Sequence, residues 1–425
     1  MPPRIESPAV AAPADATRLM PDESMPPMIS AGEAEALIRA RMPRFAAEAR
    51  PLDRAAGAVL RQRIGAERDQ PPFDRVSMDG IAIRYADFAR GMRAFTAIGM
   101  QAAGMAPLTL ERDDACIEVM TGAVLPAGCD TVIAVEQTRR DGAQRVIDPD
   151  YQPQHGQFIH RRGSDCRAGD TLLDDGHLLR APELAVLAAN GYASMAVARM
   201  PGVAILATGD ELVAVDAPVA AWQIRRSNDY ALAAMLGRRG LHDVLLEHVA
   251  DDRATLHAAI ARQLRTREVL ILTGGVSMGQ RDYVPEVLRE LGVQRVFHKI
   301  AQRPGKPMWF GIGAHGQAVF ALPGNPVSAL VCGARYVLPA LFEAMGHAAP
   351  PARVALAAPV DGTGALTWLV PVRLQPAAAG GHTAVLMPPP TSGDFSALVH
   401  TDGLVELPAG QTHFPAGYVA AYYPW

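Results

Sequence analysis

Three glycine-bearing loops carry the residues of this sequence that are best suited to chemistry. Each follows a short apolar run: "ATGDELV" follows "VAIL", "TGGVSMGQRD" follows "VLIL", and "LPGNPVS" follows "AVFA". In an open sheet of parallel strands, ligands bind beyond the carboxyl ends of the strands. If the three apolar runs form one such sheet, the three loops line a single binding site.

The third loop has the features of an anion-binding helix start. Asn325 suits the position that caps a helix, and Pro326 suits the first helical turn. Pro323 shapes the loop before them, and Gly324 lets a ligand approach the backbone closely. The free N–H groups and the positive end of the helix dipole would then face an anion.

The middle loop offers similar groups. Gly274 and Gly275 leave backbone amides uncovered, Ser277 adds a hydroxyl, and Asp282 can cap the next helix or hold a metal. A single pair of glycines after a strand is more often a plain turn, but three such loops on one sheet edge favour a ligand site. The sequence contains no G-x4-G-K-[ST] motif and no GxGxxG at a strand-to-helix turn, so neither a P-loop nor a dinucleotide fingerprint is expected.

Charged side chains gather near the loops. The acids are Asp210, Glu211, Asp251, Asp252 and Asp282, and the cations of "HKIAQRPGKP" are Lys299, Arg303 and Lys306. Singly, each acid is best explained as a helix cap or a surface charge. Together, hard carboxylates suit Mg²⁺ bound to phosphate, and the cations suit an oxyanion. The residues alone therefore predict a magnesium-assisted site for a phosphorylated ligand, with a second anion as an open alternative.

Composition excludes several other classes of protein. The 425 residues carry a net charge of −4 without a long basic run, which argues against a nucleic-acid partner. The four cysteines form no CxxC, so neither a disulfide framework nor a zinc ribbon is expected. No apolar run reaches the roughly 18–20 residues that span a bilayer, and residues 1–28 lack the apolar core of a signal peptide. We expect a disordered tail and a cytoplasmic protein without a membrane partner.

The surrounding elements predict a multidomain α/β protein. Residues 201–347 alternate strands and helices, which indicates a doubly wound, mostly parallel sheet, with "MWFGIG" and "QAVFALPG" as a hairpin-like pair. Short strands broken by glycine and proline predict an inserted β-rich domain over 51–160. Residues 29–50 and 161–200 form a mixed N-terminal domain, in which Ser30 and Glu33 close a capping box. Residues 348–425 predict a small C-terminal β domain.

Motifs over nearly the whole chain after the tail resemble one family. They are "PPFDRVSMDGIAI", "MTGAVLPAGCDTVI", "RRGSDCRAGD", "ILATGDELV", "SND", "LTGGVSMGQRDYV", "RPGKP" and "LPGNPVSALV". In this order they resemble the molybdopterin molybdenumtransferase (MoeA) family, which is related to the C-terminal part of gephyrin. The sheet domain alone is less specific, because smaller pterin-binding adenylyltransferases share it.

The resemblance implies a reaction and an assembly. Members insert molybdenum from molybdate into the dithiolene of adenylylated molybdopterin and release AMP, with Mg²⁺ required. They have four domains and form homodimers whose cleft is shared between the sheet domain of one subunit and the N-terminal half of the other. A molybdopterin adenylyltransferase and molybdoenzyme chaperones are the implied protein partners.

The resemblance also assigns roles to residues. Asp79, Thr121, Asp165 and Glu211 resemble catalytic positions, with the first two reaching the cleft from the partner subunit. Glu211, Asp252 and Asp282 resemble the acids that handle Mg²⁺. The positions implied to bind the pterin nucleotide and molybdate are Thr208, Gly209, Asp210, Gly274, Gly275, Ser277, Lys299, Arg303, Lys306, Pro323, Gly324, Asn325, Pro326 and Ser392.

The chain departs from the family pattern at two places. Where the family reads close to "DNSAMDGYAV", this sequence has Arg75, Val76, Ser77 and Ile81, and Arg303 stands where a lysine is expected. These changes leave molybdate and tungstate open as the oxyanion. Two alternatives to the transferase also stay open: a molybdopterin adenylyltransferase, and a non-catalytic pterin-binding or scaffold protein.

Overall fold

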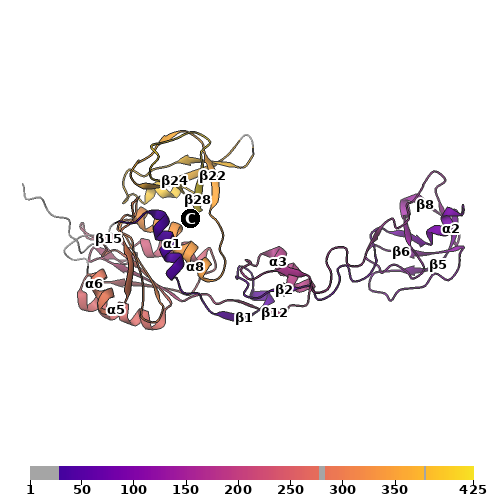
Figure 1. Cartoon of the computed structure of the whole chain (residues 1–425), viewed down its shortest axis with the longest axis horizontal. Coiled ribbons are helices and arrows are strands. Elements are labelled where there is room, and N and C mark those ends of the chain that lie inside the picture. Colours follow the sequence, from indigo (N-terminus) through magenta and orange to yellow (C-terminus); the bar gives the residue numbers. More distant parts are fainter. Residues whose placement is uncertain (1–27, 277–282, 378–379) are drawn as a thin grey trace, which may run out of the picture. The chain divides into compact units, whose positions relative to one another are not determined.

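The computed structural model describes residues 28–276, 283–377 and 380–425 (Figure 1). Ser277 and Asp282, two of the predicted site residues, lie outside these ranges. The chain divides into two compact units, which we describe separately. The first unit comprises Met1–Pro43, Pro201–Ala340 and Pro350–Trp425, and the second comprises Arg44–Met200 and Leu341–Ala349.

The first unit contains the predicted sheet. Its six strands lie in the order β16-β13-β17-β21-β20-β18. β13 (Val203–Thr208), β16 (Val244–Val249), β17 (Val269–Thr273) and β21 (Ala318–Leu322) run parallel, and β20 (Trp309–Ile312) and β18 (Gln294–His298) add an antiparallel edge. Every residue of β13, β17 and β21 is buried, as expected for strands covered on both faces. The doubly wound, mostly parallel sheet and its hairpin are confirmed.

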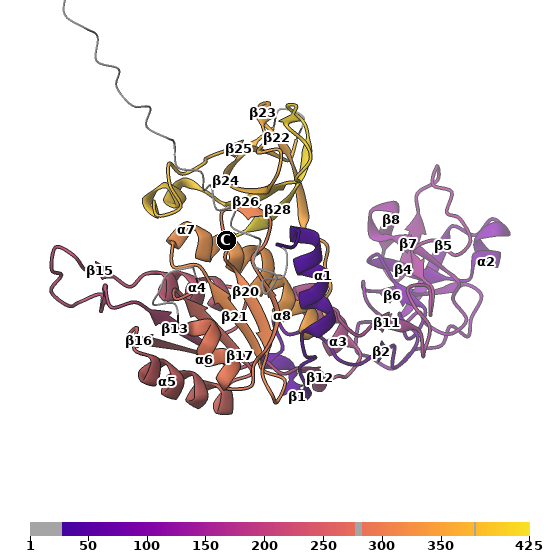
Figure 2. The same cartoon turned by 60° about the vertical axis from the view of Figure 1, so that its left-hand side comes forward.

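Helices cover both faces of this sheet (Figure 2). α5 (Arg253–Thr266) and α6 (Val284–Glu290) pack together on one face, where Leu256 and Val287 share a core with Leu206 and Leu272. α4 (Asn228–Gly237) and α7 (Pro326–Cys332) pack together on the other side. The chain visits β13, then β16 on one side and β17 on the other, so the order reverses between β13 and β17. Ligands bind open α/β sheets at such a reversal.

The helix that begins with α7 continues through the π-helical turn η3 (Gly333–Val337) into α8 (Leu338–Ala344), whose last four residues are assigned to the second unit. In the described part of the chain, Pro326–Ala344 is the one helix long and apolar enough to cross a membrane, although Arg335 interrupts its apolar run. However, 83% of its apolar window is buried inside the protein, so it is the core helix of a folded domain.

A buried arginine joins three parts of the first unit. Arg335, in the π turn, is only 4% exposed. It donates to Glu35 of α1 (Ala31–Arg41) at 2.6 Å and to Glu406 of the C-terminal domain at 2.6 Å. Tyr423 also donates to Glu406 at 3.0 Å. The predicted Ser30–Glu33 capping box begins α1.

The C-terminal part of the first unit is the predicted small β domain. Its strands follow the order β19-β24-β25-β22-β28-β26, and an added β24–β26 pairing closes the ring. The bounds are β19 (Gln302–Arg303), β22 (Ala352–Leu356), β24 (Thr367–Pro376), β25 (His382–Leu386), β26 (Gly403–Leu407) and β28 (Val419–Pro424). The shorter elements of the unit are β14 (Leu212–Val213), β15 (Ile224–Arg225), β23 (Val360–Asp361), β27 (His413–Phe414) and η4 (Ser396–His400). Because β19 carries Arg303, this domain is hydrogen-bonded directly to the predicted cationic turn.

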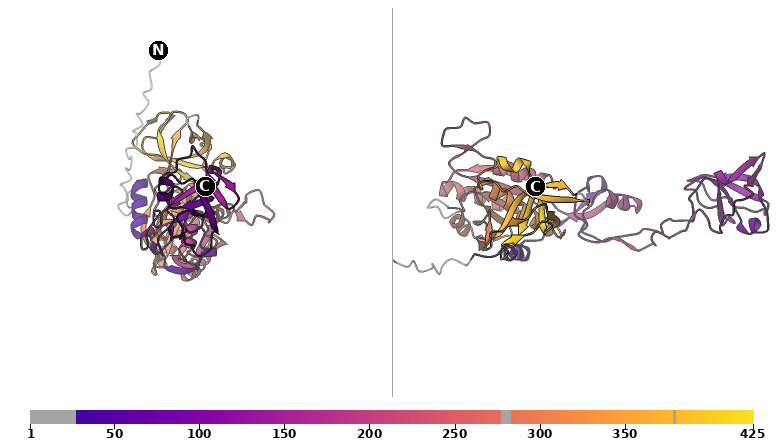
Figure 3. Two further views of the ribbon diagram at one scale, coloured as in Figure 1. Left: turned by 90° about the vertical axis from the view of Figure 1, so that its right-hand side faces the viewer. Right: turned by 90° about the horizontal axis from the view of Figure 1, so that it is seen from above.

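The second unit contains a six-stranded sheet in the order β7-β4-β6-β5-β9-β8, drawn in purple (Figure 3). Its elements are β4 (Gly80–Ile83), α2 (Tyr85–Ala89), β5 (Ala94–Gln101), β6 (Ala115–Val119), β7 (Thr131–Ala134), η2 (Val135–Gln137), β8 (Thr138–Asp141) and β9 (Gln144–Ile147). Separate apolar clusters around Ile117 and Phe95 pack on it. This sheet accounts for the predicted β-rich insert.

The remaining elements of the second unit share another core. They are β1 (Ala47–Pro51), η1 (Leu52–Arg54), β2 (Ile64–Gly65), β3 (Arg75–Val76), β10 (Ile159–His160), β11 (Thr171–Leu173), α3 (Ala181–Ala189) and β12 (Ser194–Ala198). Leu60 and Ile64 pack in one cluster with Leu187 and Val197. The sequence analysis placed residues 51–66 in the insert, and these contacts lead us to propose instead that the insert begins after about residue 66.

Candidate functional site

The three glycine-bearing loops meet at one edge of the sheet in the first unit. β13, β17 and β21 are parallel neighbours, so their carboxyl ends lie together. The Gly274 N–H donates to the Leu322 carbonyl at 3.1 Å, and the Thr208 hydroxyl donates to the Thr273 carbonyl at 3.4 Å. The predicted loop residues are therefore brought together by backbone contacts.

Two of the glycines are required by close approach. Gly274 has φ +96°, and a Cβ there would lie 2.6 Å from the Thr208 carbonyl oxygen. Gly275 has φ +65°, and its Cβ would lie 2.7 Å from a methyl group of Val284. A side chain at either position would push the loops apart, which explains the "GG" pair at this edge.

Asn228, the first residue of α4, links this helix to the third loop. Its Nδ2 donates to the Gly324 carbonyl at 2.8 Å, while its Oδ1 is buried without a partner among the described residues. From the sequence, "SND" was recognised only as a family motif. No local signal pointed to this contact, because Gly324 lies 96 residues further along the chain.

The acids after β13 and β16 lie on exposed turns. Asp210 accepts a hydrogen bond from the Asp251 N–H at 3.0 Å, and Glu211 is exposed. Asp252 caps α5, accepting from the N–H and hydroxyl of Thr255 at 2.8 and 2.7 Å. These bonds, the hydroxyl's first, lower the pKa of Asp252. It is therefore an ionised helix cap in this structure.

The predicted magnesium ligands are not gathered in the described residues. No group of three or more His, Cys, Asp or Glu side chains within residues 28–276, 283–377 and 380–425 is arranged to hold a metal. Magnesium bound together with phosphate uses only one or two carboxylates, which the exposed Glu211 and the ionised Asp252 can supply. The magnesium site stays a prediction.

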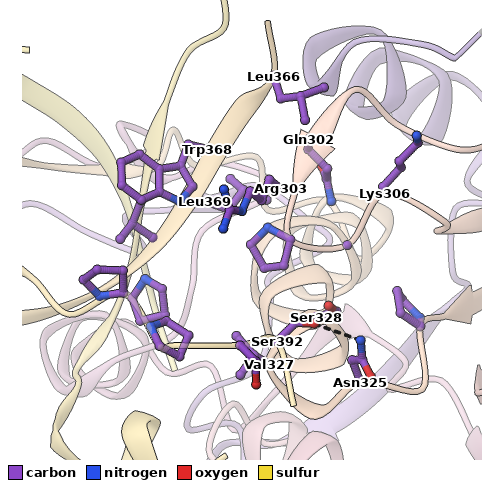
Figure 4. A pocket seen from close by; sticks show the side chains of 18 of the residues that line it. Gln302, Arg303, Lys306, Asn325, Val327, Ser328, Leu366, Trp368, Leu369 and Ser392 are labelled. Carbon is purple, nitrogen blue, oxygen red and sulfur yellow. Dashed lines mark hydrogen bonds between the residues drawn. The ribbon is translucent and has the colours of Figure 1, made fainter. Parts of the chain in front are cut away.

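A cavity of about 400 Å³ lies beside this edge, between the sheet domain and the C-terminal β domain of the first unit (Figure 4). Arg303 and Lys306 line it, and none of its described lining residues is acidic. Most of the other lining residues are apolar, among them Trp368, which lies opposite Arg303 in the β19–β24 pairing. A cationic and carboxylate-free cavity favours an anion.

Five predicted residues line this cavity: Arg303, Lys306, Pro323, Asn325 and Ser392. Asn325 occupies the N-cap position of α7 as expected, but its side chain does not cap the helix. Its Nδ2 donates instead to the Ser392 hydroxyl at 2.8 Å (Figure 4), and the Val327 N–H donates to the Ser392 carbonyl at 3.1 Å. Ser392 thus fastens the C-terminal domain to the third loop. Pro326 begins α7.

Lys299 does not line the cavity. It lies before the cationic turn with φ +75°, a conformation that is uncommon for a non-glycine residue, and its N–H donates to the Met308 carbonyl at 2.9 Å. Of the three predicted cations, the structure therefore brings only Arg303 and Lys306 to the cavity.

Buried polar groups hold the cationic turn from beneath. Gln302 is 1% exposed, accepts a hydrogen bond from the Tyr336 hydroxyl and lies 3.6 Å from the Cys332 sulfur. A Cβ on Gly305 would lie 2.5 Å from that sulfur. Burial raises the pKa of the Cys332 thiol to about 12, so it is a neutral packing group. No motif in the sequence marks Gln302 as the residue that anchors this turn.

The second unit holds the other three predicted catalytic residues. Asp79 Oδ1 accepts hydrogen bonds from the Thr121 N–H at 2.6 Å and the Thr121 hydroxyl at 2.7 Å. These two bonds, the backbone bond first, lower the pKa of Asp79. A Cβ on the next residue, Gly80, would lie 1.9 Å from the Ile133 carbonyl oxygen, so only glycine fits there. Asp79 and Thr121 are therefore hydrogen-bonded neighbours, and their catalytic role stays a prediction.

Asp165 lies in a polar turn of the same unit. It accepts a hydrogen bond from His160 at 2.7 Å, and His160 in turn contacts Arg75 at 2.9 Å. The sequence analysis noted Arg75 only as a departure from the family pattern and missed His160. No local signal pointed to His160, because it meets Arg75 only through the pairing of β10 with β3.

Comparison with known proteins covers most of the described chain. Residues 29–191 match the MoeA N-terminal region (domain I and II), residues 204–343 match a probable molybdopterin binding domain, and residues 353–425 match the MoeA C-terminal region (domain IV). A molybdopterin molybdenumtransferase of Synechocystis is 38% identical over 94% of this chain and 100% of its own. The chain belongs to the MoeA family.

Further MoeA relatives agree in sequence and in fold. The molybdopterin molybdenumtransferase of Synechococcus elongatus is 35% identical over 88% of this chain and 93% of its own. The crystal structure of a MoeA protein of molybdopterin biosynthesis from Pyrococcus horikoshii is 27% identical, with a TM-score of 0.76 over 94% of this chain and 99% of that one. The family resemblance and the multidomain architecture expected from the sequence are confirmed.

Proposed function

We propose that this chain is a transferase that inserts molybdenum from molybdate into the dithiolene of adenylylated molybdopterin and releases AMP. The observation that carries the proposal is the carboxylate-free cavity with Arg303 and Lys306, in a chain that is similar along its length to molybdopterin molybdenumtransferases. The proposal places this chemistry in the cytoplasm, in the biosynthesis of the molybdenum cofactor.

The cavity is assigned to the oxyanion. Molybdate is a dianion and needs fixed cations, and Arg303 and Lys306 supply two. The apolar wall around Trp368 keeps competing water away from one side of the anion, which strengthens its attraction to the cations. Asn325 and Ser392 position the third loop, which links the cavity to the sheet edge.

The sheet edge is assigned to the pterin nucleotide. Gly275 and Gly324 leave backbone that a phosphate can approach, and N–H groups at such loops suit an anion, whereas the Gly274 N–H is already used by the Leu322 carbonyl. Glu211 and Asp252 are the described residues that would hold magnesium, with Asp282 as a further candidate outside the described ranges. When bound, magnesium neutralises the charge on the pyrophosphate.

The carboxylates of the second unit are assigned to the same reaction. Asp79 stays ionised because Thr121 lowers its pKa, and Asp165 is held by His160. We propose that these residues act in a homodimer, where the second unit of one subunit completes the cleft of its partner. An ionised carboxylate there would orient the attacking group.

The test is AMP release from adenylylated molybdopterin by the purified full-length chain with Mg²⁺, with and without molybdate. Release that depends on molybdate and is lost in Asp79→Ala and Glu211→Ala would support the transferase. Tight binding of the adenylylated substrate without AMP release, with tungstate also inert, would favour a binding protein. Adenylylation of molybdopterin by the wild-type chain would favour an adenylyltransferase instead.

A further inference from the structure

A short β ladder in the second unit places Arg75 directly opposite His160. β3 pairs antiparallel with β10, and the register matches Arg75 to His160 and the buried Val76 to Ile159. Residues directly opposite each other on a ladder have neighbouring side chains. Here Arg75 Nη2 lies 2.9 Å from His160 Nδ1. The contact is therefore set by the backbone register.

This contact decides which imidazole nitrogen carries the proton. A guanidinium has only donors, so His160 Nδ1 must accept from Arg75. The proton of the neutral ring is then on Nε2, which lies 2.7 Å from Asp165 Oδ1 and donates to it. Arg75, His160 and Asp165 form a directed chain from a cation to a carboxylate.

Two other carboxylates near this turn, Asp74 and Asp69, are engaged by other partners. Asp74 accepts from the Arg161 side chain at 2.7 Å and from the Arg162 N–H at 2.9 Å. Asp69 accepts from the Arg162 side chain at 2.7 Å and from the Ala168 N–H at 3.0 Å. These bonds fix the backbone before and after Asp165. The side chain of Asp165 is left to His160, which is the partner the structure gives it.

The hydrogen bonds that link Arg75, His160 and Asp165 contribute little to the stability of the fold. The side chains of His160 and Asp165 are 33% and 53% exposed, and exposed ion pairs are worth about 1 kcal/mol or less. Orientation is the role that such a chain can serve, because a ring held at both nitrogens has one direction available for its Nε2–H. The segment that carries Arg75 also continues through Ser77 to Asp79, the other predicted catalytic carboxylate of this unit.

We propose that Arg75 and His160 are positioning residues: Arg75 fixes the Nε2–H tautomer of His160, and His160 aims the carboxylate of Asp165. The use of Asp165 in the reaction rests on the proposed function, whereas the tautomer does not. The proposal therefore has a structural test and a kinetic test that can fail separately.

The structural test is ¹⁵N NMR of the full-length chain labelled at histidine, with the His160 signals assigned by their loss in His160→Gln. We expect an unprotonated Nδ1 and a protonated Nε2 in the wild type. Arg75→Met should give a mixture of tautomers, and Arg75→Lys, which keeps a donor, should restore much of the wild-type pattern. A protonated Nδ1 in the wild type, or no response to Arg75→Met, would overturn the proposal.

The kinetic test is molybdate-dependent AMP release. His160→Leu and Arg75→Met should lower kcat about ten-fold with little change in KM, the loss expected from one hydrogen bond to a charged group. His160→Gln keeps an N–H donor and should lose less than His160→Leu. Arg140→Met, an exposed arginine on β8 of the same unit, is the matched control and should match the wild type.

The two tests separate the ways of being wrong. An Arg75→Met chain with altered tautomers but wild-type kcat would refute the positioning role. If the wild-type chain releases no AMP, the proposed function fails, while the NMR result still decides whether Arg75 sets the tautomer.

Discussion

In the first unit, the pocket cations lie on a turn whose backbone is held by buried groups. In the second unit, the carboxylates of Asp79 and Asp165 are held by exposed side chains. Beneath Arg303 and Lys306, Gln302 is buried and bonded. By contrast, Thr121 reaches Asp79 from an exposed turn, and the half-buried His160 reaches Asp165 from the short edge strand β10. The cations thus depend on packing, and the carboxylates depend on the chemistry of single side chains.

The largest effect is expected from removing the two pocket cations. The double variant Arg303→Gln, Lys306→Gln keeps side-chain length and the buried support of the turn but removes both charges. Hydrogen bonds to charged groups are worth about 1.5–3 kcal/mol each, so molybdate-dependent AMP release should fall about 10³-fold. Titration with molybdate in the same assay should show the loss as a much higher molybdate requirement.

Arg373→Gln is the matched control for that variant. Arg373 lies on β24, the strand that carries Trp368 of the cavity wall, but it is exposed and does not line the cavity. It should behave as the wild type. Equal losses in Arg373→Gln and the double variant would mean that general positive charge, and not the cavity, attracts the oxyanion.

A smaller but still large effect is expected from packing at the sheet edge. Gly274→Ala places a Cβ 2.6 Å from the Thr208 carbonyl oxygen at φ +96° and should destabilise the first unit by about 3 kcal/mol. Gly292→Ala has a similar φ of +78° with no atom within 4 Å and should cost about 1 kcal/mol. The difference between the two isolates the close approach from the backbone conformation.

Tryptophan fluorescence measures this effect in the right part of the molecule. All four tryptophans, Trp222, Trp309, Trp368 and Trp425, belong to the first unit. The thermal midpoint should therefore fall further in Gly274→Ala than in Gly292→Ala. Equal midpoints would show that the loops can separate at little cost. The first unit's site would then not depend on packing, which would contradict the comparison with the second unit.

The sheet edge could be predicted from the sequence because its signals are local. Apolar runs of strand length followed by "TGG" and "LPGNP" indicate strand ends, close backbone approach and a helix start. These features do not depend on which residues are the tertiary neighbours of the loops. The Asp79–Thr121 pair could be anticipated only through the family motifs, since the two residues are 42 positions apart. Nothing in either motif alone states that the threonine donates twice to one carboxylate oxygen.

Contacts set by register could not be predicted. His160 meets Arg75 only because β10 pairs with β3, 85 residues away. Asn325 has a good capping side chain, yet Ser392 of another domain competes for it at 2.8 Å. Asp252 differs from Asn325, because its side chain does cap its helix. This carboxylate, which could also bind a metal, accepts a hydrogen bond from the N–H of Thr255, three residues further on. Local propensity gives the candidates, and tertiary partners decide between them.

The smallest effect concerns the hydroxyl of Thr121 and tests the side-chain-held site. Donation from the Thr121 N–H, and then from its hydroxyl, lowers the pKa of Asp79. Thr121→Val removes only the second donor, so the pKa should rise part of the way toward the ordinary value of about 3.9. A lowered folded pKa contributes stability that is present above the unfolded pKa and is lost as pH falls through the folded pKa.

At neutral pH both the wild type and Thr121→Val keep Asp79 ionised, and AMP release should differ little. Below the ordinary aspartate range, Thr121→Val should lose stability at a higher pH than the wild type, whereas Thr121→Ser, which keeps the hydroxyl, should follow the wild type. A ¹³C NMR titration of the Asp79 carboxyl group in all three chains gives the answer, and an unchanged titration in Thr121→Val would mean that the backbone N–H alone holds this carboxylate.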